Sequence, residues 1–225
     1  CLAGVFTFAD ALRLVTLRGR LFERIRGGGM VSVPLSAADC ERHLSGNLDL
    51  ATINAPGLCV VSGPDAELDA FARKLQQSEI EVQRVRIAIA AHSRLLEPIL
   101  GEFGQFLASI TLRAPQLPFV SNRTGTWITP AQATDPRYWV EHLRNTVRFA
   151  DGVDVLLRDP THVFLEVGPG RTLSSLVRQH PAWSGDRSAI ASLRHPDEKI
   201  ADEAYFAGAE ARLWAAGAPV PSERL

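Results

Sequence analysis

The sequence predicts an α/β protein in which a small ferredoxin-like unit is inserted into a larger body of strands and helices. Residues 30–87 give short apolar runs and helical periodicities in the order β-α-β-β-α-β, the order of a ferredoxin-like unit. Strand-then-helix pairs follow this insert, which favours a mostly parallel sheet in the body. Hydrophobic residues make up 46% of the 225 residues and charged residues 22%, as in an ordinary globular domain.

An amphipathic helix is expected first, over residues 8–24 (FADALRLVTLRGRLFER). Thr7 is a suitable N-cap because its hydroxyl can accept a hydrogen bond from the first turn. The glycines at 27–29 are expected to end the helix. Its apolar stripe, spaced by three or four residues, comprises Phe8, Leu12, Val15 and Leu21.

The insert follows directly. Its expected strands show alternating or continuous apolar runs, and its expected helices show apolar residues on one face. Ser36 is the expected cap of the first insert helix. The expected strands cover residues 30–35, 50–54, 58–62 and 81–87, and the expected helices cover residues 36–44 and 64–78.

The rest of the chain continues the α/β pattern. A strand expected at 163–167 ends in Gly-Pro-Gly and leads into a helix, and a site in such a body belongs at the carboxyl ends of strands. We expect helices over 94–109, 136–158 (in two pieces), 172–179 and 200–217, a short strand at 119–122, a turn at 123–125, loop and strand at 181–198, and a linker at 218–225.

Charge and cysteine content exclude several classes of function. Lys plus Arg number 24 and Asp plus Glu 25, so no basic field is available for nucleic acid. No apolar run is long enough to span a bilayer, and no signal-peptide pattern opens the chain. Three unpaired cysteines (Cys1, Cys40 and Cys59) indicate reduced thiols in a cytoplasmic protein. No cluster has metal-ligand spacing, so no metal is expected.

Several phrases, in order, resemble one family. CLAGVFTFADALRLVTLRGRLF is similar to the segment after the nucleophile in malonyl-CoA:acyl-carrier-protein transacylases and polyketide-synthase acyltransferase domains. AAHSRLLEPIL resembles the family's catalytic-histidine motif. VSNRTGTWIT, DPRYWVEHLRNTVRFADGV and FLEVGPGRTLSSLV follow in the family's order, and ARLWAAGAPV resembles the linker after these domains in modular type I synthases. The match covers essentially the whole chain.

The resemblance implies an α/β-hydrolase-like large subdomain, partial here, that carries the ferredoxin-like small subdomain. Residues 1–29 would be a large-subdomain helix, 30–90 the small subdomain, 91–185 the rest of the large subdomain and 186–225 the post-acyltransferase linker. The family's GHSxGE nucleophile elbow does not occur in these 225 residues. By resemblance it belongs about nine residues before Cys1, so we expect a fragment that cannot form the acyl-serine alone.

His92 and Arg18 are the residues to which the resemblance gives chemistry. His92 would be the general base, taking a proton from the serine and later from the phosphopantetheine thiol. The alternative is a loop histidine that caps the following helix. Arg18 would grip the free carboxylate of malonyl or methylmalonyl groups through a bidentate pairing. The alternative is a solvated helix arginine, as expected for Arg13 and Arg20.

His142 stands where relatives carry Gln, Asn or His, and there it would orient the catalytic imidazole through its backbone carbonyl. A polar residue on a helix face is an equal alternative. Ile89, Ala90 and Ala91 match the stretch that tracks acyl choice in the family, where HAFH accompanies malonyl and YASH methylmalonyl. IAAH fits neither, and the small Ala91 leans weakly to methylmalonyl, although these residues could simply finish a buried strand. Asn54 could line the site, with a turn role favoured.

The function implied is transfer of a malonyl-type acyl group from coenzyme A to the phosphopantetheine thiol of an acyl-carrier protein, by a ping-pong route through an acyl-serine. Acyl-CoA, the carrier protein and other synthase domains are the expected partners, and the step needs no metal or redox cofactor. A non-catalytic docking or structural module is a second hypothesis, favoured by the missing motif.

Glu166 is expected to be structural rather than an acid catalyst.

Overall fold

The computed structural model describes residues 1–221, and the four residues at 222–225, the end of the expected linker, lie outside the described part. The chain divides into two compact units, one from Cys1 to Gly152 and one that begins at Val153. None of the helices in residues 1–221 is long and apolar enough to cross a membrane. Within the same residues no group of three or more His, Cys, Asp and Glu side chains is arranged to hold a metal ion.

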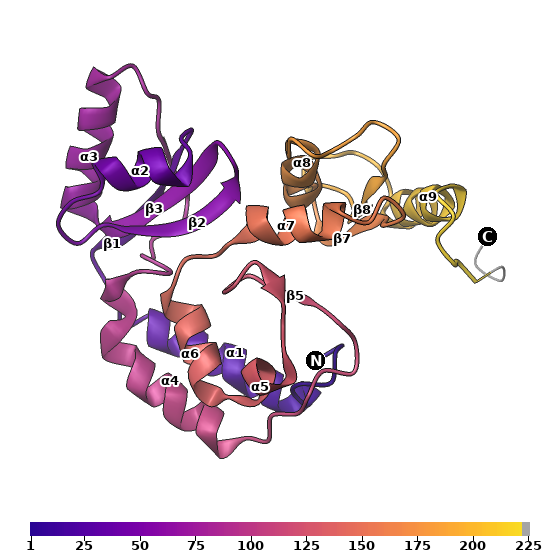
Figure 1. Cartoon of the computed structure of the whole chain (residues 1–225), viewed down its shortest axis with the longest axis horizontal. Coiled ribbons are helices and arrows are strands. Elements are labelled where there is room, and N and C mark those ends of the chain that lie inside the picture. Colours follow the sequence, from indigo (N-terminus) through magenta and orange to yellow (C-terminus); the bar gives the residue numbers. More distant parts are fainter. Residues whose placement is uncertain (222–225) are drawn as a thin grey trace. The chain divides into compact units, whose positions relative to one another are not determined.

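The ferredoxin-like insert is confirmed. Its four strands form one antiparallel sheet in the order β2-β3-β1-β4 (Figure 1), which is the arrangement that β-α-β-β-α-β connectivity gives in this fold. Ser36 caps the first insert helix through its hydroxyl, as expected. The elements are β1 (Gly28–Val33), α2 (Ala37–His43), β2 (Asp49–Ala55), β3 (Leu58–Pro64), α3 (Asp65–Gln77) and β4 (Gln83–Arg84).

The two faces of this sheet have different neighbours. Side chains along each strand alternate between the two faces, so each face carries its own apolar residues. Helices α2 and α3 cover one face and enclose the main core of the unit (Figure 1). The opposite face carries a smaller cluster against which Val85 and Ala91 pack. The larger core comprises Val31, Val33, Cys40, Leu48, Leu50, Cys59, Val61, Leu68, Phe71 and Leu75, and the smaller cluster comprises Met30, Ala51 and Val60.

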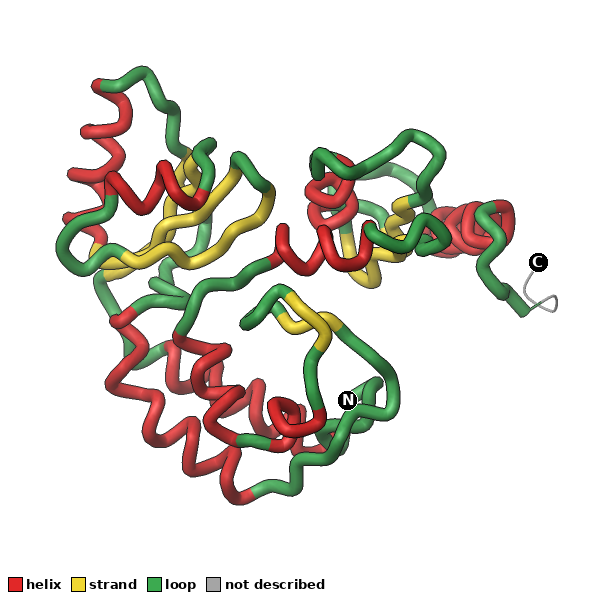
Figure 2. The backbone as a smooth tube through the Cα atoms, viewed as in Figure 1, coloured by secondary structure: helices red, strands yellow, loops and turns green. Residues whose placement is uncertain are grey.

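A helical layer forms the rest of the first unit (Figure 2). Its long helices are α1 (Phe8–Phe22), α4 (Glu97–Ser109) and α6 (Pro136–Arg144), with α4 following the 3-10 helix η1 (Arg94–Leu96). They pack through a core of Leu21, Leu96, Ile99, Phe103, Leu107 and Leu143, with Leu14 and Leu17 of α1 against it. The short elements β5 (Val120–Ser121), β6 (Thr126–Trp127) and α5 (Pro130–Thr134) lie between α4 and α6 in the chain.

The second unit contains the parallel pairing expected of the body. Helix α7 (Phe149–Leu157) crosses the division between the units, and β7 (Phe164–Pro169) pairs in parallel with β8 (Ala189–Leu193). Glu166 accepts hydrogen bonds from the backbone amides of Leu173 and Ser174, so it caps the first turn of the next helix, which fits the structural role expected for it. That helix is α8 (Thr172–Arg178), and the expected linker segment contains β8 and the final helix α9 (Asp202–Ala215).

Several local expectations were wrong. Strand β4 is two residues long rather than covering 81–87. Helix α1 ends at Phe22, before the glycines, and Gly28 and Gly29 belong to β1. Only one residue of the expected apolar stripe of α1 is buried: Leu21 is buried, whereas Phe8, Leu12 and Val15 are exposed. Strand β6 and helix α5 were not expected at all.

Candidate active site

His92 sits in a tight turn at the end of the loop that leaves the sheet. Just after β4 the amide of Val85 donates to the carbonyl of Met30 in β1 at 2.9 Å, and the side chains of Val85 and Ala91 pack against the smaller cluster on the sheet. His92 then adopts a left-handed backbone conformation with φ of 55°, which costs a non-glycine residue about 1 kcal/mol or more. Buried Ser93 fixes the turn, because its hydroxyl donates to the carbonyl of Ala90 and accepts from the amide of Leu95.

The imidazole of His92 is oriented by a backbone carbonyl. Its Nδ1 atom lies 3.0 Å from the carbonyl oxygen of Asn145. A carbonyl can only accept a hydrogen bond, so Nδ1 carries the proton and Nε2 of the neutral ring keeps a free lone pair. The carbonyl is available because α6 ends at Arg144 and Asn145 is extended: its amide still donates to the carbonyl of Glu141, but its own carbonyl lies beyond the helix. This arrangement prepares Nε2 to act as a base.

The surroundings keep His92 neutral. Burial is the main cause and lowers its pKa below the ordinary value of 6.5. The hydrogen bond to Asn145 opposes this effect, and the positive charge of Arg18 adds to it. A neutral imidazole at pH 7 is the form that a general base requires.

His142 lies beside His92, and its backbone is one of the groups that act on the imidazole. The two rings meet edge to face with centroids 6.5 Å apart. Nδ1 bonds to the carbonyl of Asn145 at 3.0 Å, and a hydrogen bond with the backbone of His142 is a smaller influence that also raises the pKa of His92. A carbonyl in the last turn of α6 has no partner within the helix, so the backbone of residue 142 can accept a hydrogen bond as well as that of residue 145. The orienting role of His142 stays a prediction.

The side chain of His142 is also neutral at physiological pH. Burial, together with the charges of His92, Arg123 and Arg18, lowers its pKa to about 4. Its ring contacts that of Trp139, with centroids 6.1 Å apart, and Trp139 in turn contacts Phe6. His142 thus belongs to a group of aromatic rings beside His92 and is uncharged at pH 7.

Arg18 is close enough to both histidines for its charge to act on them. It is an exposed residue of α1, and its guanidinium stands over the ring of Phe22 with Cζ 5.5 Å from the ring centroid. Its charge lowers the pKa values of both His92 and His142, so the three groups share one electrostatic environment. Arg13, in contrast, is well exposed and 3.7 Å from Asp10, as expected of a solvated helix arginine.

The three residues before His92 are packed rather than open. Ala90 is fully buried, and a Cβ placed on Gly28 would come within 2.8 Å of its side chain. Ala91 packs against the smaller cluster on the sheet, and Ile89 is half-buried. The expectation that they finish a strand was wrong, because β4 ends at Arg84 and they form a loop. Asn54 is half-buried within β2 rather than in the turn that follows it.

Sequence reasoning missed residues that shape the site. The Asn145 carbonyl carries no residue-type signal, and its only clue was its place in the LRNTVRF phrase. Arg123 was expected only in a turn, yet its charge acts on His142. An open polar cavity of about 490 Å³ adjoins His92, and its lining includes Asp49, Leu50, Arg94, Arg144, Asn145 and Thr146.

Comparison with known proteins agrees with this fold. The profile of the acyl transferase domain family matches residues 1–213. The chain is similar to a phenolphthiocerol/phthiocerol polyketide synthase of Mycobacterium tuberculosis, at 38% identity over 219 residues, which cover 97% of this chain and 15% of that protein. It is 35% identical over 222 residues to polyketide synthase GfsA of Streptomyces halstedii, covering 97% of this chain and 3% of that protein.

Solved structures give the same result. The acyltransferase domain of SpnD, in complex with 2-(pent-4-yn-1-yl)malonyl, matches with a TM-score of 0.91 and 40% identity over 96% of this chain and 53% of that one. The acyltransferase domain of ZmaA matches with a TM-score of 0.90 and 38% identity over 100% of this chain and 52% of that one. FabD from Acinetobacter baumannii, at 22% identity, 95% of this chain, 67% of that one and a TM-score of 0.78, shares the fold.

The fold and these matches identify the family. The chain belongs to the acyl transferase domain family, and its homologues are acyltransferase domains of modular polyketide synthases. It spans about half the length of the solved domains it resembles and a much smaller share of the whole synthases.

Proposed function

We propose that this chain is the carboxyl-terminal part of a domain that transfers a malonyl-type acyl group from coenzyme A to the phosphopantetheine thiol of an acyl-carrier protein. The observation that carries the proposal is the His92 imidazole, neutral and held through Nδ1, with Nε2 free to accept a proton. The nucleophilic serine is supplied by residues outside these 225, within the same domain. Acyl-CoA, the carrier protein and neighbouring synthase domains are the partners.

The reaction has two half-steps with His92 in both. In the first, Nε2 takes the serine hydroxyl proton while the serine oxygen bonds to the acyl carbon. The bond from that carbon to the coenzyme A sulfur breaks, and the proton passes to the departing thiolate. In the second, Nε2 takes the proton of the phosphopantetheine thiol, whose sulfur bonds to the acyl carbon. The ester bond to serine then breaks, and the proton returns to the serine oxygen.

Arg18 selects the acyl group in this proposal. Its guanidinium is always charged and presents paired N–H donors that match a carboxylate. Arg18 is exposed, and no ion pair joins it to an acidic side chain among the described residues. Its charge also lowers the pKa of His92, which shows that the two side chains are near each other. Such a clamp favours malonyl-type groups over acetyl, which has no free carboxylate.

Methylmalonyl is the extender that we weakly prefer over malonyl. The argument is that Ala91 stands where the malonyl-associated HAFH pattern has its bulky Phe. The SpnD acyltransferase domain, solved with an α-substituted malonyl group, adds support from a relative at 40% identity. Against it stands the packing of Ala90 and Ala91 into the protein interior.

In the same proposal, residues 1–29 and 91–185 belong to the large subdomain, 30–90 are the small subdomain and 186–225 the linker.

Mass spectrometry of the full-length protein tests the proposal. The protein is incubated with malonyl-CoA or methylmalonyl-CoA, digested and searched for an acyl ester. We expect the ester on one serine that precedes Cys1 in the full-length chain, and its loss when carrier protein with a phosphopantetheine arm is added. No ester on any serine with either thioester would refute the proposal.

A non-catalytic docking module is the second candidate, because these 225 residues contain no GHSxGE sequence. On that hypothesis the full-length protein binds carrier protein without forming an ester. The two candidates are separated by the same incubation, combined with a pull-down of the carrier protein. Ester formation supports the enzyme, whereas carrier binding without an ester supports the docking module.

A further inference from the structure

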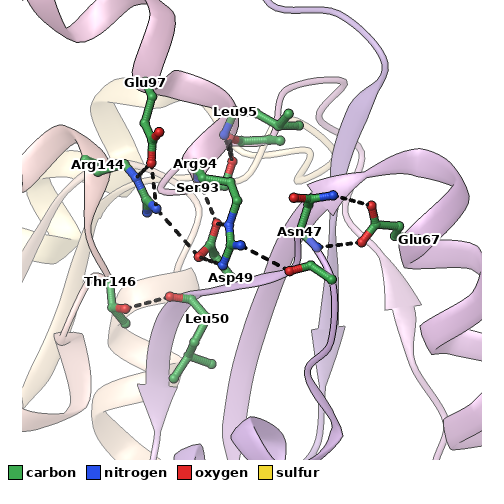
Figure 3. A network of polar contacts seen from close by, with 12 residues as sticks. Asn47, Asp49, Leu50, Glu67, Ser93, Arg94, Leu95, Glu97, Arg144 and Thr146 are labelled. Carbon is green, nitrogen blue, oxygen red and sulfur yellow. Dashed lines mark hydrogen bonds and ion pairs between the residues drawn. The ribbon is translucent and has the colours of Figure 1, made fainter.

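A carboxylate at the start of strand β2 holds the turn that carries His92. Asp49 is the first residue of β2, and its Oδ2 atom accepts hydrogen bonds from the backbone amide of Arg94 at 2.7 Å and from its Nε at 3.1 Å. Its Oδ1 atom accepts from Nη2 of Arg94, also at 3.1 Å (Figure 3). The carboxylate therefore fixes both the backbone and the guanidinium of a residue only two positions after His92.

The same carboxylate faces the segment that supplies the carbonyl to His92. Nη2 of Arg144 lies 3.7 Å from Oδ1 of Asp49 and 3.3 Å from Oε1 of Glu97 (Figure 3). Arg144 is the last residue of α6, directly before Asn145. Asp49 thus lies between two arginines, each close in sequence to one partner of the hydrogen bond between His92 and Asn145.

Strand β2 continues to hold the chain just beyond Asn145. The hydroxyl of Thr146 donates to the carbonyl of Leu50 at 2.6 Å. The amide of Val147 donates to the carbonyl of Ala51, and the amide of Ile53 donates to the carbonyl of Val147, both at 2.8 Å. Strand β2 therefore binds both the turn at 92–94 and the segment at 144–147.

Burial and charge support a specific role for Asp49. Only 16% of its side chain is exposed, so its bonds to Arg94 are poorly screened by water. Burial would raise the pKa of Asp49, but the hydrogen bonds from Arg94 and the charges of Arg144 and Arg94 outweigh it and hold the pKa below its ordinary value. The carboxylate is therefore ionised at pH 7 and is shared by two guanidinium groups.

We infer that Asp49 is a positioning residue for the acyl transfer proposed above, because through Arg94 and Arg144 it fixes the two chain segments whose hydrogen bond orients the His92 imidazole. Asp49 makes no direct contact with the imidazole in this arrangement. Its effect on the reaction is through the geometry of the bond between Nδ1 and the Asn145 carbonyl, on which the direction of Nε2 depends. The inference rests on the proposed role of His92 as the base.

Two substitutions in the full-length protein test it. Asp49→Asn keeps one oxygen to accept from the Arg94 amide but removes the charge, and Asp49→Ala removes both. Because misplacing a base by a fraction of an ångström slows chemistry more than binding, we expect kcat to fall by about 10-fold for Asn and about 100-fold for Ala. The KM for acyl-CoA is expected to stay within about twofold. Asp69→Asn, which removes a carboxylate paired with Arg84 at the surface, is the matched control and should leave both constants unchanged.

Hydrogen–deuterium exchange gives a readout that does not depend on acyl transfer. In Asp49→Ala we expect faster exchange in peptides covering residues 90–96 and 143–148, with β1 and β3 as protected as in the wild type. Uniformly faster exchange over the whole insert would indicate a merely structural role and overturn the inference. Wild-type kcat in Asp49→Ala would also overturn it. A wild-type protein without acyl transfer would instead refute the proposed function, whatever the exchange pattern.

A double-substitution cycle checks the route through Arg94. Because Asp49 also acts through Arg144, Arg94→Gln should lower kcat by no more than Asp49→Asn does, and the double variant should be little worse than Asp49→Asn alone. Losses that multiply would mean that the two residues act independently, and this would contradict the inference.

Discussion

The Nδ1 atom of His92 and the carbonyl oxygen of Asn145 lie 3.0 Å apart, although 53 positions separate the two residues in the chain. The bond joins the loop that leaves the ferredoxin-like sheet to the segment that leaves helix α6. It fixes which nitrogen of the imidazole carries the proton, and so which nitrogen is left to accept one. A proton acceptor at a defined position therefore results from the way two parts of the first unit are joined.

The lowered pKa of His92 predicts the pH dependence of acyl-enzyme formation. The reaction needs the neutral imidazole, so its rate should be constant near pH 7 and fall only when the pH drops below His92's own pKa, which lies below 6.5. Single-turnover acylation of the full-length protein, followed from pH 5 to pH 8, measures this limb. A midpoint above 6.5 would contradict the environment described for His92.

Arg18 is predicted to set the preference for a charged acyl group. Arg18→Ala should lower kcat/KM for malonyl-CoA by about 100-fold or more, because a charge-assisted bidentate pairing is lost, and should change the value for acetyl-CoA far less. Arg20→Ala, two residues along the same helix, is the control and should affect neither substrate. Equal losses for the two acyl groups in Arg18→Ala would count against the clamp.

His142 is predicted to make the folded state sensitive to acid. Its pKa is about 4 when folded and near 6.5 when unfolded, so the unfolded chain binds the proton more readily in between. Stability is then fully present above pH 6.5 and lost as the pH falls toward 4, by about 2 kcal/mol at pH 5. Pulse proteolysis of the full-length protein, monitoring cleavage within residues 1–152, measures this loss. His142→Gln should remove that part of the pH dependence, and an unchanged acid sensitivity would show that another group causes it.

The core of the ferredoxin-like unit is predicted to tolerate little truncation. Leu68 on α3 is fully buried against Val61 and Phe71, so Leu68→Ala should cost about 2 to 5 kcal/mol through lost burial and a residual cavity. Gln76→Ala, on the exposed side of the same helix, should change stability by less than about 0.5 kcal/mol. The same proteolysis assay compares them, and equal effects would contradict the packing described for α3.

Much of the fold could be predicted because its local signals agree with its packing. The insert was predictable since its strands alternate between two faces and its helices carry one apolar face each. The end of α1 was not predictable from the glycine run. Gly28 is needed where β1 packs closely against the loop and 3-10 helix that follow the sheet: a Cβ there would come within 2.8 Å of both Ala90 and Leu95, and this tertiary reason leaves no local mark.

The site was predictable where a side chain carries the chemistry and unpredictable where the backbone does. His92 and Arg18 are conspicuous residue types within recognisable phrases, and the structure places them in one electrostatic environment. The carbonyl at Asn145 could have come from any residue type, so no side chain in the sequence marked it. Asp49 gave no signal because an acidic residue before an apolar strand usually lies in solvent.

The role of His92 as the base is tested most directly by acyl-ester formation in His92→Ala. Full-length wild-type and variant proteins are mixed with malonyl-CoA, quenched over time, and the ester is counted by intact-protein mass spectrometry, with unchanged thermal unfolding as the check on folding. We expect the ester to form at least about 100-fold more slowly in His92→Ala, since the serine loses the group that removes its proton. Formation of the ester at the wild-type rate in the folded variant would contradict the account.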